Sequence, residues 1–435
     1  EPLNRLTDRL NCRICKATAH SADVLFFPLR ERLGFDARQL TPTVVLKITV
    51  AAAESRSFFR ATKVVNHVGG LAVSAKTIER VVHDVGHELA SRRDVDPKSD
   101  DALAIRPETP PDLAVVECDG GRMRTREPGN GPGVHFSGEG WKENKNACLI
   151  RAQRKTFSED PQPEPPRCFW DPEHVAKIAE TEALSVASPL PRDDMDEDDE
   201  SQEALVSTTD WRPKQLVRTV LSSMSSSDEF GQQMAREAKR RRFHEASAKA
   251  FLGDGLNWNW SIWKARFRDF TPILDFIHVL SYLYVAAKAV HPKADEAWDQ
   301  YLVWMRGCWQ GDVEQVLHEL KVWQEKLGPA PTEAPDNDSR KIIAKTVTYL
   351  NNNKSRMQYP QYRREGMPVT TAWMESLVKE MGYRVKGTEM FWNNPDGAEA
   401  ILQIRAGALC DDDRLVEHLK TREGHPFTRR PKRPI

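Results

Sequence analysis

The spacing of apolar residues changes along the chain, and each change predicts a different kind of element. From about Thr41 to Leu89 apolar positions recur at helical spacing, and this region ends in two helices separated by Gly69 and Gly70. Farther on, alternating and continuous apolar runs predict three strands that form an antiparallel meander. These strands are Leu113–Cys118, Arg122–Glu127 and Asn144–Ala152.

The second half of the chain has mainly helical spacing, interrupted by two short runs typical of strands. We expect strands at Lys249–Leu252 and Pro272–Asp275, helices at Gln215–Ser223 and Glu229–Ala250, and mostly helices in the remainder to about Lys420. A meander followed by alternating strands and helices is the order of a ribonuclease-H-like domain. The expected fold is α+β: a ribonuclease-H-like mixed sheet with a large helical insertion, preceded by an all-α helix-turn-helix region.

A length of 435 residues is compatible with about three domains. A stretch rich in proline and acidic residues, about 158–210, is predicted to be a partly mobile insertion in the sheet domain. The expected divisions are 1–40, a partial zinc-ribbon-like or irregular segment; 41–92, the helix-turn-helix region; 93–111, a linker; 112–278, the core with its acidic insertion; 279–366, the helical insertion; 367–415, the final helical region of the core; and 416–435, a basic tail.

The charges of the chain are unevenly distributed, although they sum to only −1. Residues 193–200 form an acidic run that we expect to be solvated, whereas residues 239–242 and 429–433 are basic. The basic runs are compatible with a solvated surface and also with contacts to nucleic acid. In the first of them the candidates for DNA binding are Lys239, Arg240 and Arg241.

Several features favour an intracellular protein without a membrane partner. No apolar stretch approaches the roughly 18 residues that a membrane span needs, and the first residues lack the pattern of a signal peptide. Seven cysteines at wide spacing argue against a disulfide framework. Cys12 and Cys15 form one C-x-x-C pair, which is half of a structural Zn²⁺ site but also compatible with ordinary thiols. The absence of an initiating Met indicates a processed chain or part of a longer product.

The second helix of the predicted pair has a basic face. Ser74 is suited to its N-cap, and Lys76, Arg80 and His83 follow one another on one side at i, i+4 and i+7. A helix of this kind can enter the major groove of DNA, which makes these three residues candidate DNA contacts. A plain helical hairpin is the structural alternative.

Three acidic residues are the candidate catalytic groups, and they lie far apart in the sequence. Asp119 follows a buried apolar run, Asp254 follows the short strand that begins at Lys249, and Glu375 lies in the first turn of an amphipathic helix. Together they could bind two divalent cations for phosphoryl transfer on nucleic acid. Asp275 and His278 are further candidates that would orient this site or bind DNA.

Each acid also has a structural explanation when it is taken alone. Asp119 precedes two glycines and could belong to a hairpin turn, and Asp254 could be a helix N-cap. Glu375 and Lys379 could form an ion pair at i, i+4, while Asp275 and His278 could be a hydrogen-bonded pair in the core. The catalytic hypothesis depends on the joint placement of the three acids.

At these residues the chain resembles bacterial insertion-sequence DDE transposases of the ISKra type, distant relatives of the Mutator-like group. The similarity extends from Cys12 to about Arg414, and its motifs occur in the family's order. The matching stretches are 116–122 (VECDGGR), 253–255 (GDG), 273–279 (ILDFIHV), 351–357 (NNNKSRM) with Tyr362-Arg363, and 366–369 (GMPV) with Met374-Glu375.

The resemblance implies a catalytic site in which Asp119, Asp254 and Glu375 bind two Mg²⁺ (or Mn²⁺) ions. The enzyme would cut transposon ends with an activated water, and the freed 3′-hydroxyl would then attack target DNA. The implied partners are double-stranded DNA, as terminal repeats and target, and further copies of the chain, at the bacterial nucleoid in the cytoplasm. The family's two zinc knuckles are reduced here to Cys12 and Cys15, and its Gly-Ser-Gly before the glutamate is Thr370-Thr-Ala372.

Three other functions are compatible with the same residues. A domesticated DNA-binding protein would keep the fold without catalysis, and a nuclease would hydrolyse DNA without joining strands. A helical scaffold protein would show no salt-dependent affinity for DNA.

Overall fold

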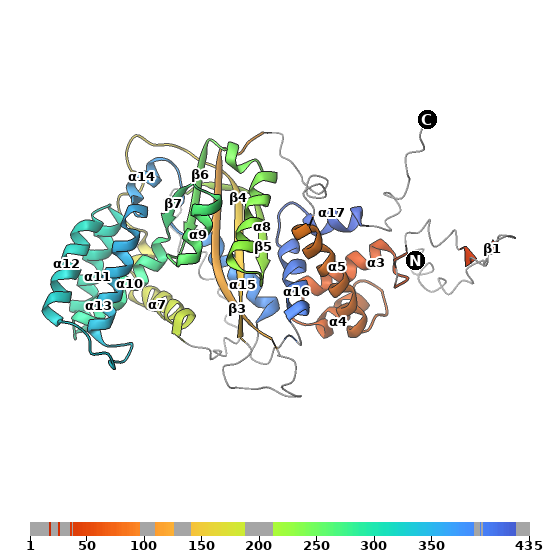
Figure 1. The fold of residues 1–435 in the computed structure, drawn as a ribbon, viewed down its shortest axis with the longest axis horizontal. Helices are drawn as coiled ribbons and strands as arrows, with labels where there is room; N and C mark the ends of the chain where they lie inside the picture. The colour runs from red at the N-terminus through yellow and green to blue at the C-terminus, as the bar shows by residue number, and fades with distance from the viewer. Residues whose placement is uncertain are drawn as a thin grey trace.

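A computed structural model describes residues 17–18, 25–26, 35–36, 38–95, 109–125, 141–187, 212–386, 392 and 395–422. Over this part the chain is α+β: a five-stranded mixed sheet lies between a helical layer at one end and a second group of helices at the other (Figure 1). Two strands of two residues each, β1 (Ala17–Thr18) and β2 (Leu25–Phe26), form a separate antiparallel pair. Cys12, Cys15, the acidic run and the basic tail from 423 onward lie outside the described residues.

The large sheet has the strand order β5-β4-β3-β6-β7. Antiparallel pairing joins β3 to β4 and β4 to β5, whereas β6 pairs in parallel with both β3 and β7. The first residues of β3 are buried on both faces, as expected for a central strand covered by helices on both sides. The five strands are β3 (Leu113–Arg124), β4 (Trp141–Gln153), β5 (Lys214–Ser223), β6 (Ala248–Gly253) and β7 (Thr271–Leu274).

The predicted meander is wrong in two places. β3 continues without a turn through Gly120 and Gly121, so the strand predicted at Arg122–Glu127 is the second half of β3. A Cβ on Gly121 would lie 2.9 Å from a side-chain atom of Asn144 on β4, so close packing across the ladder, rather than a hairpin, explains this glycine. Residues 215–223, predicted as a helix, form the third strand β5.

Three helices at the N-terminal end form a compact group: α3 (Pro42–Glu54), α4 (Phe58–His67) and α5 (Ala75–Val95). Ser74 caps α5 as predicted, because its Oγ accepts a hydrogen bond from the Thr77 amide at 3.1 Å. The apolar side chains of α5 at Ile78, Val81, Val82 and Val85 are buried. α5 packs along α16 (Pro395–Ala408) so closely that a Cβ on Gly86 would lie 2.4 Å from the Ala400 carbonyl oxygen.

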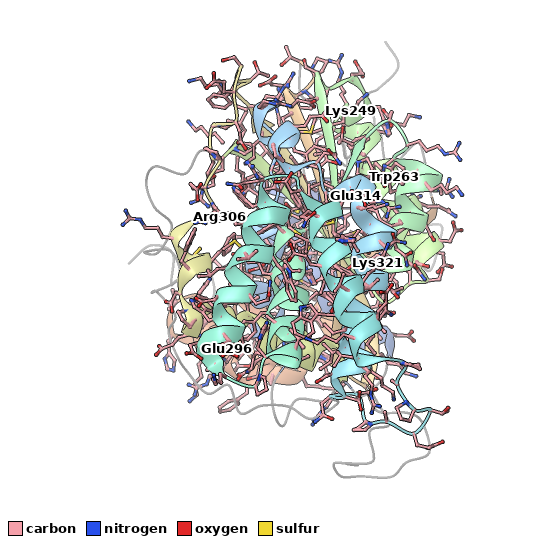
Figure 2. The ribbon with its side chains drawn as sticks, turned by 90° about the vertical axis from the view of Figure 1, so that its left-hand side faces the viewer. Lys249, Trp263, Glu296, Arg306, Glu314 and Lys321 are labelled. Carbon is pink, nitrogen blue, oxygen red and sulfur yellow. The ribbon has the colours of Figure 1, made fainter. Side chains whose placement is uncertain are left out.

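The remaining helices cover the sheet, and some of them form a separate helical layer at one end of it. In Figure 1, α10 to α13 form a layer beside β7, and Figure 2 shows the outer side of this layer with exposed Glu296, Arg306, Glu314 and Lys321. None of the described helices combines the length and apolarity of a membrane span. The helices are α7 (Pro172–Ala187), α8 (Ser227–Arg240), α9 (Asn257–Arg266), α10 (Phe276–Val290), α11 (Ala294–Trp309), α12 (Val313–Leu327), α13 (Ser339–Asn353), α14 (Tyr359–Arg364), α15 (Ala372–Val385) and α17 (Arg414–Thr421).

Residues 158–187 of the predicted mobile insertion are packed against the helical layer. α7 contacts α10, the Trp309 indole donates a hydrogen bond to the Gln162 carbonyl at 2.9 Å, and the Tyr301 hydroxyl donates to the Phe169 carbonyl at 3.2 Å. These contacts satisfy backbone groups of a proline-rich stretch that forms little regular structure of its own. This half of the segment is therefore part of the fold.

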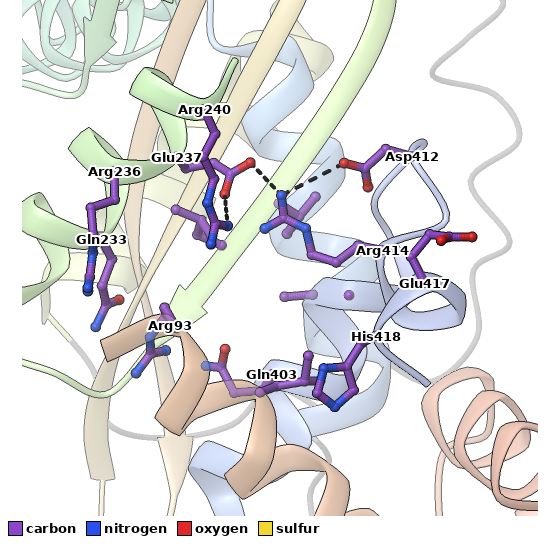
Figure 3. Close-up of a pocket in the computed structure, with 15 residues that line it drawn as sticks. Arg93, Gln233, Arg236, Glu237, Arg240, Gln403, Asp412, Arg414, Glu417 and His418 are labelled. Carbon is purple, nitrogen blue, oxygen red and sulfur yellow. Dashed lines mark hydrogen bonds and ion pairs between the residues drawn. The ribbon is translucent and has the colours of Figure 1, made fainter. Parts of the chain in front are cut away.

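A buried cluster of charges connects α8 to the loop before α17 (Figure 3). Glu237 on α8 forms ion pairs with Arg240 and Arg241, each at 3.0 Å, and with Arg414. Burial alone would raise the pKa of Glu237, but the charges of Arg414, Arg241 and Arg240 outweigh burial and lower it well below the ordinary value. Of the three residues predicted in this basic block, Arg241 is buried, Arg240 is partly buried and Lys239 is exposed.

We predict that Glu237→Gln lowers the free energy of unfolding by about 3 kcal/mol at pH 7, because it leaves buried guanidinium groups without their counter-ion. A depressed carboxyl pKa stabilises the fold above the unfolded value of about 4.3, and this stabilisation is lost as the pH falls toward the folded-state pKa. The difference between the two proteins, measured by urea unfolding, should therefore shrink below about pH 4.

The matched control is Glu245→Gln, since Glu245 forms an exposed ion pair with Arg242 three residues away. Exposed pairs contribute little to stability, so this variant should unfold almost as the parent does. Equal effects of the two substitutions would contradict the role assigned to the buried cluster.

Candidate functional site

The parallel pairing of β3 with β6 brings two of the predicted acids to the same edge of the sheet. The last paired residues are Glu117 on β3 and Leu252 on β6. Asp119 lies two positions after Glu117, and Asp254 lies two positions after Leu252. Neighbouring strands lie about 4.8 Å apart, so matching positions of two strands are close in space. Both aspartates are half-buried.

The pKa of the buried Cys118 thiol responds to the charges of both of these acids. Its pKa is raised well above the ordinary value, first by burial and then by the negative charges of Asp254, Asp119 and Glu117. The thiol therefore stays protonated at neutral pH, which argues against Cys118 as a nucleophile. Its neighbourhood shows that the end of β6 and the middle of β3 concentrate acidic side chains.

Asp254 is not the N-cap of α9, which is Leu256, but its side chain has another structural role just before that helix. Its Oδ1 accepts hydrogen bonds from the Leu256 amide at 2.8 Å and from Asn259 Nδ2 at 2.5 Å, at the start of α9. The Tyr349 hydroxyl of α13 donates to the Asp254 carbonyl oxygen at 2.8 Å. Gly255 follows with a φ of +103°, a conformation that favours glycine. The loop carrying Asp254 is thus held by both α9 and α13.

Glu375 lies in the first turn of α15, and this turn is tied to the sheet by two other acids. The Met374 amide donates a hydrogen bond to Glu117 Oε2 at 2.9 Å, and the Thr371 amide donates to Asp275 Oδ1 at 2.8 Å. Carboxyl groups at a helix N-terminus satisfy amides that lack partners within the helix. Glu375 therefore reaches the same end of the sheet as the two aspartates through α15.

Glu117 is a fully buried acid that the sequence prediction missed. Its pKa is raised well above the ordinary value, first by burial and then by the charge of Asp275, with a smaller contribution from Glu375 and an opposing one from the Met374 amide. Its Oε1 is buried without a hydrogen-bond partner among the described residues. The available signal was a single charged residue inside the apolar run 113–118, where an unpaired charge is costly.

Asp275 and His278 form the hydrogen-bonded pair that the sequence offered as one alternative. Asp275 is fully buried, and its Oδ2 lies 2.6 Å from His278 Nδ1 and accepts the His278 amide at 3.3 Å. Asp275 therefore caps α10 while its other oxygen holds the Thr371 amide at the start of α15. One buried carboxylate orients the two helices that flank the acids.

The three candidate acids have the donor chemistry of a Mg²⁺ or Mn²⁺ site, because carboxylate oxygens are the ligands that hard cations prefer. In the conformation of the described residues, no three His, Cys, Asp or Glu side chains are arranged as a metal-binding group. Asp119 Oδ1 accepts its neighbouring Gly120 amide at 2.6 Å, and Asp254 Oδ1 faces α9. Rotation of these side chains would be needed before they shared an ion with Glu375.

The predicted DNA-binding face of α5 is present in the fold. Lys76 and Arg80 are exposed, and Lys76 forms an ion pair with Glu79 at 2.8 Å. His83 is partly buried, and its pKa is lowered first by burial and then by the nearby His87, so it is neutral at pH 7. The charge of this face therefore comes from Lys76 and Arg80.

The pocket drawn in Figure 3 lies away from the three acids. It is formed by α5, β5, α8, α16 and α17, and its polar lining includes Arg93, Arg236, Arg240 and His418. Carboxylates of Glu237, Asp412 and Glu417 line it as well. This mixture of charges belongs to the contact between the N-terminal helices and the sheet domain.

Comparison with known proteins gives no further assignment. No protein-family model matches the chain, and no curated protein matches it at a significant level.

We predict that Asp275→Ala lowers the free energy of unfolding by about 3 kcal/mol, because the buried Thr371 amide loses its acceptor and α10 loses its cap. Asp338→Ala is the matched control, since Asp338 caps α13 through the Arg340 amide without joining a second element. The control should lose clearly less stability in thermal unfolding. A loss of the same size in both variants would show that Asp275 is only a helix cap.

Proposed function

We propose that this chain is a DDE-type DNA transposase, which cuts the ends of a DNA element and joins them to target DNA. The observation that carries the proposal is the placement of the acids at one end of the sheet. Asp119 lies on β3 and Asp254 directly follows β6, each two positions beyond the last parallel pair, and Glu375 lies on a helix whose first turn is bonded to the same central strand. Three acids distant in sequence are thereby drawn toward one region.

The strand order supports a ribonuclease-H-like assignment for the sheet. An antiparallel meander of β3, β4 and β5 is followed by β6 and β7, both parallel to β3, with helices between them. The first candidate acid lies on the central strand, the second follows the strand beside it, and the third lies on a later helix. This is the order of the triad in the transposases that the sequence resembles.

In the proposed reaction, Asp119, Asp254 and Glu375 would hold the divalent cations. Such ions lower the pKa of an attacking water and stabilise a leaving oxygen, so few further acid-base groups are required. The chain's own contribution is positioning: Asp275 and Glu117 fix the first turn of α15, and Tyr349 and Asn259 hold the loop of Asp254. Helix α5 would bind double-stranded DNA. A multimer of the chain would hold two DNA ends together at the bacterial nucleoid.

The competing proposal is a DNA-binding protein that keeps this fold without catalysis. It is favoured by the hydrogen bonds of Asp254 at the start of α9, which give that residue a structural role independent of a metal. Metal-dependent cleavage of a terminal-repeat duplex separates the two proposals, and strand-joined products separate a transposase from a hydrolytic nuclease.

Each of Asp119→Asn, Asp254→Asn and Glu375→Gln should abolish both strand cutting and strand joining in Mg²⁺, because each removes a charged ligand. Binding of the same duplex should persist, since it depends on other residues. Glu325→Gln, an exposed acid on α12, is the control and should cut as the parent does. Cleavage retained by one of the three variants would exclude that residue from the triad.

Lys76→Gln and Arg80→Gln should each weaken duplex binding and reduce the slope of log K against log salt by about 0.9, the value for one lost phosphate contact. Fluorescence anisotropy at several salt concentrations measures both quantities. The control is Lys293→Gln, an exposed cation at the opposite end of the molecule beside α11. An unchanged slope in the α5 variants would exclude this face from DNA contact.

A further inference from the structure

Two aromatic rings are exposed on neighbouring helices, and each lies beneath a cation. Phe59 on α4 is 63% exposed, and Lys63 Nζ lies 5.0 Å from its ring centre. Tyr383 near the end of α15 is 47% exposed, and the Arg56 guanidinium carbon lies 4.8 Å from its ring centre. A cation over each ring face is a favourable electrostatic contact, and both rings remain open to a further stacking partner.

The two rings belong to one continuous surface because α15 ends against the junction of α3 and α4. Arg384 Nε donates to the Ala52 carbonyl at 2.8 Å, and its guanidinium lies over the Phe58 ring at 4.9 Å. Arg56, which lies over the Tyr383 ring, directly precedes the N-cap of α4, so Tyr383 lies beside the start of the helix that carries Phe59. We name this surface the α4–α15 strip, and its exposed members are Arg56, Phe59, Arg60, Lys63, Lys379 and Tyr383.

The strip carries positive charge, since four of its six members are cations. Two carboxylates near these cations, Glu54 at the end of α3 and Glu380 on α15, are paired with arginines outside the strip. Glu54 binds Arg405 at 2.7 Å, and Glu380 binds Arg218 at 3.0 Å. The field of the strip is therefore suited to a polyanion.

The strip also leads toward the candidate catalytic site. Ser376, Lys379 and Tyr383 are exposed at i, i+3 and i+7 along α15, which places them on one side of the helix that carries Glu375. At 1.5 Å per residue, Glu375 and Tyr383 are about 12 Å apart along the axis, the length of about three stacked nucleotides. A strand bound at the strip would thus extend to the acids.

We propose that the α4–α15 strip binds single-stranded DNA next to the site of cutting, with bases stacked on Phe59 and Tyr383 and phosphates beside the four cations. Alternating cations and exposed rings are the chemistry of single-strand binding, because a duplex hides the faces of its bases. The inference rests on the proposed function for the identity of the strand, but its binding test requires no catalysis.

The test measures binding of a labelled oligothymidylate of twelve nucleotides to the full chain by fluorescence anisotropy. EDTA is present so that no divalent cation is available for cutting. Phe59→Ala and Tyr383→Ala should each weaken binding roughly ten-fold without changing the salt slope, because stacking is lost while charge is kept. Arg60→Gln and Lys63→Gln should instead reduce the slope by about 0.7 each. Phe59→Trp should retain affinity, and Val303→Ala, which changes an exposed apolar residue on α11, should bind as the parent does.

Unchanged affinity of the Phe59→Ala and Tyr383→Ala variants would overturn the proposal, as would an equal loss in Val303→Ala. An equal loss for a blunt duplex of the same length would also overturn it, because stacking on unpaired bases would then not be the cause. If the chain cuts terminal repeats but its binding of oligothymidylate does not depend on the two rings, only the proposed role of the strip is refuted. A chain that binds through the rings but never cuts would refute the transposase proposal alone.

Discussion

The hydrogen bond between the Met374 amide and the buried carboxyl group of Glu117 connects the central strand to α15, and the position of Glu375 depends on it. Asp275 makes the equivalent contact to Thr371, three positions earlier in the chain. Both acceptors come from the sheet side, so the first turn of α15 is held at two points by acids that are themselves buried. A helix held in this way cannot slide or rotate without leaving buried polar groups unsatisfied, which costs several kcal/mol.

The parallel ladder supplies the other half of the arrangement. Because β3 and β6 run side by side in the same direction, Asp119 and Asp254 come to matching positions. The helical layer from α10 to α13 then reaches back to the loop of Asp254 through Tyr349. A long helical segment between the second and third acids is therefore compatible with a single site, since it also braces the second acid.

Sequence patterns within a single segment correctly predicted several helices and strands. Ser74 and the helical spacing of apolar residues up to Leu89 identified α5, and the short strands near Lys249 and Pro272 were recognised from their apolar runs. Residues 215–223 were misjudged because a strand at the edge of a sheet is defined by pairing with β4, which lies some 70 positions earlier. The partner of Glu117 could not be predicted for the same reason, since its partner amide is 257 positions away. The three acids could be proposed from sequence, but the alignment of Asp119 with the end of β6 follows from the sheet register, and the position of Glu375 follows from long-range hydrogen bonds.

The most direct test of the account is the location of bound Mn²⁺ in a crystal of the full chain, read from its anomalous scattering. We predict two ions about 3.5–4 Å apart, with ligand oxygens from Asp119, Asp254 and Glu375 after their side chains rotate. Ions bound elsewhere, with these three carboxylates on separate surfaces, would contradict it.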